Sequence, residues 1–135
     1  MSGGALRSVH RDERGSVGAL VIQVAVCVVL AGLVVHDGGQ ILRAQVKAQS
    51  AARAAASEAA NEYRHSRNQS RALGAAAEAA VVAESDAKVT KVEFEPDGSA
   101  TVTVAEPAST IVARHFSFLK GFTTQRASDK ESPTR

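Results

Sequence analysis

Aromatic residues and cysteine are scarce in this chain of 135 residues, which has no Trp, one Tyr and one Cys. Its 44% of hydrophobic residues consists largely of Ala and Val, whose small side chains bury little area each. Any part outside a membrane is therefore expected to have a thin core and to depend on a partner or on neighbouring copies. The single cysteine, Cys27, excludes an intramolecular disulfide.

Charge of one sign is not concentrated anywhere along the chain. The formal net charge is only +2, and acidic residues accompany the basic ones in every section of the sequence. Nucleic-acid binding needs a concentrated cationic face, commonly with aromatic residues between the basic ones. The pattern predicts no nucleic-acid partner.

The sequence also lacks the spacings that catalytic and metal sites require. Its four histidines lie in four different segments, and no HExxH, CxxC, P-loop or GxSxG motif occurs. His36 and Asp37 are adjacent, so on a helix they point to different faces and form no dyad. We expect no catalytic residues, no metal, no cofactor and no small-molecule substrate, and therefore no enzyme.

One uninterrupted apolar run is present, from residue 17 to residue 35. As a helix its nineteen residues measure about 28 Å, close to the hydrocarbon thickness of a bilayer. The run predicts a single transmembrane helix at 17–35 after a cytoplasmic tail at 1–16. Gln23 is its one strongly polar side chain and is expected to contact a neighbouring helix.

Basic residues on the two sides of the apolar run are nearly balanced. Arg11 and Arg14 lie closest to it, which favours a cytoplasmic N-terminus and an extracytoplasmic C-terminal region in the cell membrane. The chain is thus predicted to be a single-pass membrane protein.

Strong helix formers continue beyond the apolar run and predict an Ala-rich helical region at 36–87. Gly38 and Gly39 are expected to bend the helix without ending it, which gives one helix from about residue 17 to about residue 65. A sparse apolar face is expected from Ile41, Leu42, Val46 and Tyr63. After a break at 68–70, a second short helix is expected, with Leu73, Ala77, Ala80 and Val81 at helical spacing.

The periodicity changes to two in a small β-rich region at 88–128. Thr90, Val92 and Phe94 alternate with charged residues, Pro96-Asp97-Gly98 predicts a tight turn, and a return strand follows. A third strand is expected within 122–128 and a disordered tail at 129–135. The predicted class is α+β: a long N-terminal transmembrane helix continuing into an Ala-rich helix, a second short helix, and a small antiparallel hairpin or sheet.

One pattern over roughly residues 11–65 resembles a known family. Arg14-Gly15-Ser16 precedes the apolar run, Asp37-Gly38-Gly39 follows it, and Gln49-Ser50-Ala51-Ala52 lies in the Ala-rich helix. This arrangement resembles the TadE/TadG-like, pseudopilin-like proteins of tight-adherence (Flp) pilus assembly. The resemblance implies a membrane-anchored structural protein whose partners are other pilus-assembly or secretion components or copies of itself. Asp37, Gly38 and Gly39, together with Gln23, are the candidate helix-packing contacts.

The same resemblance implies a candidate processing site at Gly15 and Ser16. Processed members of the family carry a Glu five residues after the cleaved Gly, but this chain has Leu20 there. That departure favours an uncleaved anchor. Two alternatives stay open: a secreted small binding protein whose signal peptide is cleaved after Val29-Leu30-Ala31, and a generic single-pass anchor for a regulatory partner.

Overall fold

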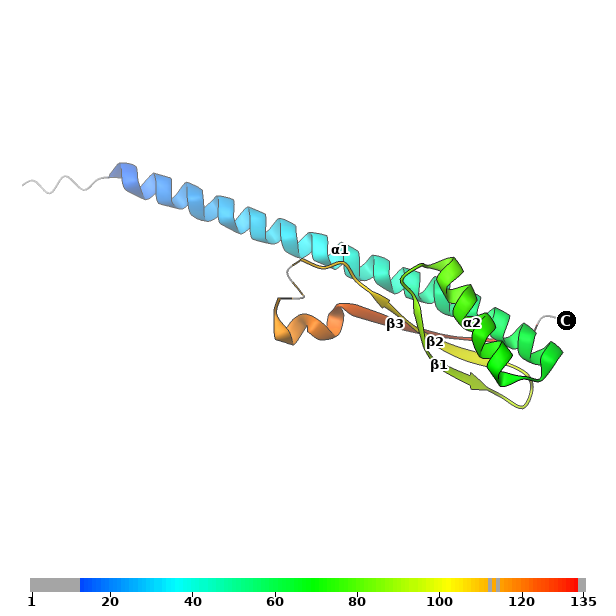
Figure 1. Cartoon of the computed structure of the whole chain (residues 1–135). Helices are drawn as coiled ribbons and strands as arrows, with labels where there is room; N and C mark the ends of the chain where they lie inside the picture. Colours follow the sequence, from blue (N-terminus) through cyan, green and yellow to red (C-terminus); the bar gives the residue numbers. More distant parts are fainter. Residues whose placement is uncertain (1–12, 112, 114, 134–135) are drawn as a thin grey trace, which may run out of the picture. The chain divides into compact units, whose positions relative to one another are not determined.

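The computed structural model describes residues 13–111, 113 and 115–133, with side chains described from residue 17 onward. The elements follow in the order α1 (Glu13–Ser66), α2 (Gln69–Ala83), β1 (Lys88–Phe94), β2 (Ala100–Pro107), the 3-10 helix η1 (Ser117–Phe122) and β3 (Thr124–Glu131) (Figure 1). The predicted α+β class is confirmed. The chain divides into two compact units, one ending at Leu33 and the other beginning at Val34.

Helix α1 runs through Gly38 and Gly39 without a break, so the prediction of one long helix is confirmed. Of the described residues, this is the one helix that is long and apolar enough to cross a membrane. In the first unit, every described side chain from residue 17 to residue 32 is exposed. Apolar side chains in that state lack a protein core to bury them.

The α1–α2 connection closes α1 with a left-handed residue and opens α2 with a side-chain cap. Arg67 has φ +52°, and its N–H donates to the Tyr63 carbonyl at 2.9 Å, the bond that ends a helix in this way. The Asn68 side chain then accepts from the Arg71 N–H at 3.2 Å, which satisfies one free donor of α2. The break predicted at 68–70 is present, but it lies at Arg67 and Asn68, and α2 already begins at Gln69.

The three strands form one antiparallel sheet in the order β1-β2-β3. Val102 pairs with Val92 on one side and with Asp129 on the other. The predicted hairpin and third strand are both confirmed. Strand β3 continues to Glu131, three residues beyond the boundary at 128, because Ala100 and Thr101 of β2 pair with Glu131 and Lys130.

A β-bulge at Thr90 corrects the expected alternation of β1. Val89 pairs with Val104 and Lys91 with Thr103, which leaves Thr90 as an extra residue. Such a residue shifts the side-chain phase by one, so Thr90 is exposed whereas Val89 and Val92 pack against the core. The Thr90 hydroxyl donates instead to the Thr103 carbonyl at 3.2 Å.

Alanine builds most of the core between the helices and the sheet. The contributing positions of α1 recur every three or four residues and therefore share one face. They pack with residues of α2 and of the sheet's inner face, and the whole cluster is Ala48, Ala51, Ala52, Ala55, Ala56, Ala59, Ala60, Ala76, Ala80, Ala87, Ala100, Val102, Val104 and Ala127.

The large apolar residues expected to form the helix faces mostly lie elsewhere. Leu42 and Val46 of α1 are exposed, as are Leu73 and Val81 of α2, so that part of the prediction is wrong. Sequence periodicity predicted the correct helices but the wrong faces, because the buried alanines one or two positions away form an equally regular stripe. Tyr63 is partly buried and stacks on Phe94 of β1, with ring centroids 4.6 Å apart.

The β1–β2 turn yields a first prediction, since Gly98 has φ +88°. Gly98→Ala should lower the free energy of unfolding by about 1–2 kcal/mol, because a Cβ is strained in this conformation. Thermal unfolding of the full chain in detergent, followed by Tyr63 fluorescence, measures the change.

Gly74 provides the matched control for Gly98→Ala. It lies inside α2, and a Cβ added there meets nothing within 4 Å. Gly74→Ala should stabilise the protein by about 0.5–1 kcal/mol through helix propensity. Equal effects of the two substitutions would contradict the turn geometry.

Candidate functional site

Asp37 of α1 makes a polar contact with a distant part of the chain. Its carboxylate oxygens accept hydrogen bonds from the backbone N–H groups of Ile111 (Oδ1, 2.8 Å) and Ala113 (Oδ2, 2.8 Å). The residue is only 5% exposed. Hydrogen bonds from N–H groups to an ionised carboxylate are about twice as strong as neutral ones. This carboxylate therefore fixes a C-terminal segment to α1 more than seventy residues earlier in the chain, and we call the arrangement the Asp37 clasp.

The segment held by the clasp is a closed loop. The N–H of Ala108 donates to the Thr123 carbonyl at 2.7 Å, so the two ends of the loop 108–123 are bonded to each other. Helix η1 lies within this loop, just before β3 (Figure 1). The clasp thus holds a compact loop that returns directly into the sheet.

Gly38 and Gly39 stand next to Asp37 on α1 but have no close neighbour. A Cβ built on either glycine meets nothing within 4 Å in the described structure. Both residues are exposed, so this part of α1 presents an open backbone surface. A contact with another helix at Gly38 and Gly39 stays a prediction.

Gln23 and Leu20 lie on one exposed face of α1 together with Val24, Cys27 and Ala31. That face belongs to the first unit and is apolar apart from Gln23. Gly15 and Ser16 are helical, but their side chains are outside the described residues. The processing site at Gly15 and Ser16 and the packing role of Gln23 both stay predictions.

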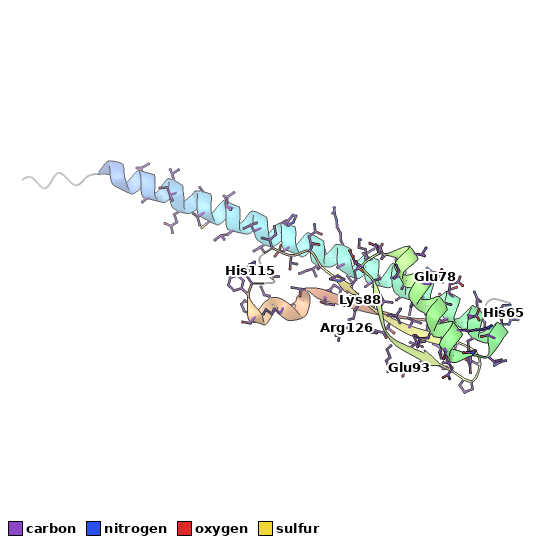
Figure 2. All side chains as sticks on the ribbon, in the orientation of Figure 1. His65, Glu78, Lys88, Glu93, His115 and Arg126 are labelled. Carbon is purple, nitrogen blue, oxygen red and sulfur yellow. The ribbon has the colours of Figure 1, made fainter. Side chains whose placement is uncertain are left out.

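The histidines that the structure describes lie in separate places: His36 is in the middle of α1. His65 lies in the last turn of α1, and His115 lies before η1 (Figure 2). Among the described residues, no group of three or more His, Cys, Asp or Glu side chains is placed to hold a metal ion.

Glu106 of β2 is a buried carboxyl group that the sequence analysis missed. It is 2% exposed, and its Oε2 has no hydrogen-bond partner within the described part of the chain. Burial raises the pKa of the Glu106 carboxyl; the Lys47 ammonium opposes that rise, and the negative charges of Asp86 and Glu84 reinforce it. Lys47 is engaged elsewhere, in an ion pair with Glu84 at 2.9 Å, which raises the pKa of Lys47.

A signal for Glu106 was present in the sequence. It continues the two-residue period of Val102 and Val104, and strand residues two apart face the same side of a sheet. The role of Asp37 had no such signal, because its partners are backbone N–H groups that any sequence supplies.

These observations define a class of protein. It is an α+β protein with a long N-terminal helix that begins with an apolar run. Asp37, just beyond that run, is a carboxylate with a structural role. Residues 15–62 match the family model described as putative Flp pilus-assembly TadE/G-like. The predicted resemblance to the TadE/G-like family is therefore confirmed over this segment. The matched segment contains the whole apolar run, Asp37 and most of the alanine face. No curated protein sequence and no solved structure matches the chain.

The clasp yields a second prediction. Asp37→Asn should destabilise the domain by about 1.5–3 kcal/mol, because an amide nitrogen would replace one of the two acceptor oxygens and face an N–H donor. The change in unfolding free energy is measured on the full chain in detergent. Asp86→Asn removes one negative charge from an exposed side chain and should change stability by less than about 0.5 kcal/mol. If the clasp does not contribute to stability, Asp37→Asn and Asp86→Asn will have the same unfolding curve.

A third prediction concerns pH and Glu106. At low pH the carboxyl is protonated in both states. As pH rises, the unfolded chain releases this proton first, so folding stability falls until the pH passes the raised folded pKa. Glu106→Gln should abolish this fall and be more stable than the wild type at pH 7, above the range in which the unfolded chain releases the proton.

Unfolding of the wild type and of Glu106→Gln between pH 4 and 8 tests the assignment, with Glu78→Gln on exposed α2 surface as control. The stability difference between Glu106→Gln and the wild type should grow with pH, whereas Glu78→Gln should follow the wild type. A difference independent of pH would show that Glu106 is not the titrating group.

Proposed function

We propose that the chain is a non-enzymatic, membrane-anchored structural component of a Flp-type pilus-assembly or secretion apparatus. Residues 17–35 span the cell membrane, the N-terminus lies in the cytoplasm, and the region from residue 36 onward projects outside it. The partners are other components of the apparatus or copies of the chain. The observation that carries the proposal is the TadE/G-like match, which coincides with the exposed apolar part of α1.

The exposed side chains of the second unit support an assembly role. Leu42, Val46, Leu73 and Val82 are large, apolar and exposed, while alanines fill the core. A small domain that leaves its large apolar residues outside gains stability from contact with neighbours. Shallow grooves lie beside two of these residues, one between α1 and α2 at Val82 and one between α1 and β3 at Val46.

The continuity of α1 also supports an anchor over a cleaved signal peptide. The helix passes through Ala31 and Gly32 directly into the Ala-rich part, and the family match begins before the apolar run. Cleavage after Ala31 would divide the TadE/G-like segment.

A fourth prediction tests the anchor and its function together. A charge at the centre of a membrane helix costs roughly 3 kcal/mol on insertion scales. Val26→Arg should therefore shift protein from the carbonate-resistant membrane fraction to the soluble fraction and fail to restore pilus assembly or secretion in cells lacking the gene. Val26→Leu is the matched control and should behave as the wild type. Wild-type protein released by alkaline carbonate, or normal assembly in cells without the chain, would refute the proposal.

A fifth prediction concerns processing at Gly15–Ser16. Cutting there would leave a charged amine at the edge of the hydrocarbon, where an uncompensated charge costs several kcal/mol. A Glu at this position in a neighbouring chain would relieve that cost by neutralising the amine. Leu20 has no charge and cannot neutralise it. We expect mass spectrometry of chains co-expressed with a prepilin peptidase to find the N-terminal tail intact in the membrane fraction.

The variant Leu20→Glu supplies the comparison, because it restores the missing carboxylate. Of the two chains, only this variant should reach material sheared from the cell surface. Wild-type chains that begin at Ser16 in the sheared material would overturn the uncleaved-anchor interpretation.

A further inference from the structure

The loop 108–123 carries a cluster of exposed aromatic side chains. Phe116, Phe118 and Phe122 are 50%, 77% and 59% exposed, and Ile111 is 49% exposed. The rings of Phe116 and Phe118 are neighbours, with centroids 5.9 Å apart. In a protein with four Phe and no Trp, three of the largest apolar side chains thus lie outside the core. Clustered exposed apolar residues of this kind mark a surface that another apolar phase covers.

The aromatic cluster is presented by a fixed loop. The Ala108–Thr123 hydrogen bond closes its ends, and the Asp37 clasp holds Ile111 and Ala113. Backbone bonds from Leu119 to Phe116 and from Thr123 to Lys120 shape η1 itself. The aromatic side chains therefore project from a bonded scaffold, which lowers the conformational cost of placing them in a partner phase.

The clasp sets the loop close to the end of the apolar run. Val35 is the last residue of that run, and Asp37 follows about 3 Å further along the helix axis. Phe116 is three residues from Ala113 and so lies within about 11 Å of it. The headgroup layer on each side of a bilayer is on the order of 5–8 Å thick. If residues 17–35 span the membrane, the Phe116–Phe122 segment is within reach of that layer.

The charge pattern of the loop suits the same location. No acidic residue occurs between Glu106 and Asp129, whereas Arg114, Lys120 and Arg126 lie in that interval. Lys120 is in η1, between Phe118 and Phe122. Aromatic side chains alternating with basic ones are typical of segments at the surface of membranes that contain anionic lipids.

We infer that the Phe116–Phe122 segment inserts its Phe side chains into the headgroup layer of the leaflet from which α1 emerges. This second membrane contact rests on the proposed anchoring of residues 17–35. It would hold the C-terminal domain against the bilayer and restrict its rotation about the anchor. The occupant of the aromatic surface is the lipid of the chain's own membrane, recognised through aromatic burial and attraction of Lys120 to anionic headgroups.

The absence of Trp from the chain permits a direct test with single-tryptophan variants of the full-length protein. Phe118→Trp places an indole at the most exposed Phe, Val28→Trp places one within the apolar run, and Leu73→Trp places one on exposed α2 surface. Leu73 follows the far end of α1, about 44 Å along the helix from Asp37. Each variant is reconstituted into vesicles of phosphatidylcholine and phosphatidylglycerol whose acyl chains carry bromine either near the headgroup or near the chain end.

The inference predicts that shallow bromine removes most of the emission of Phe118→Trp, that deep bromine removes most of that of Val28→Trp, and that Leu73→Trp is unaffected by either. Emission of Phe118→Trp that resists both brominated lipids, while Val28→Trp is quenched, would overturn the inference and leave the anchor intact. A blue-shifted but unquenched Phe118→Trp would show that protein covers the segment, which also overturns it. An unquenched Val28→Trp would remove the anchor and, with it, both proposals.

Discussion

The fold of the second unit depends on a helix face made of alanine. The inner face of α1 from Ala44 to Ala60 is lined by buried methyl groups, and the inner face of the sheet packs on it through Val102, Val104 and Ala100. Burying an alanine side chain contributes little to the stability of the fold. The core therefore tolerates neither the loss of many contacts nor the addition of larger side chains. The arrangement therefore depends on supporting contacts at both ends of the alanine face: the Tyr63–Phe94 stack near the C-terminal end of α1, and the Asp37 clasp about midway along α1, where the second unit begins.

The clasp explains why an acidic residue, Asp37, can be buried just beyond the apolar run. A buried carboxylate is costly unless N–H donors satisfy it, and the loop backbone at Ile111 and Ala113 supplies them. The family match ends at residue 62, yet a residue inside it holds a loop well outside it. The part of the chain beyond the match is in this way fixed to the matched helix. Gly38 and Gly39 next to the clasp keep an open helix surface that a neighbour could approach closely.

Local signals in the sequence were enough to predict the elements. The uncharged run at 17–35, the helix formers after it, and Pro96-Asp97-Gly98 between alternating residues gave the long helix and the hairpin correctly, because each depends on interactions a few residues apart. The faces were harder to predict. Thr90 lies on the opposite face from the one expected because a bulge is set by pairing with β2. Leu42 and Leu73 lie outside because the choice between two helical stripes is made by tertiary packing.

The candidate site was predictable only in part. Asp37 was recognised as a position of interest through the family resemblance, but its partners lie more than seventy residues away and are backbone groups. Glu106 carried a strand-period signal, and its burial contradicts the usual exposure of glutamate. Gly15, Ser16 and Gln23 are predicted to act through other molecules, so their roles depend on an assembly and not on the fold of one chain.

Hydrogen exchange of the full chain in lipid bilayers, resolved to single amides, tests the central claim most directly. The proposed arrangement is a membrane helix with a carboxylate at its exit, and this carboxylate fixes the C-terminal loop. It predicts slow exchange from residue 20 to residue 35, slow exchange at Ile111 and Ala113, and selective acceleration of those two loop amides in Asp37→Asn. Fast exchange at Ile111 and Ala113 in the wild type, or along the apolar run, would contradict it.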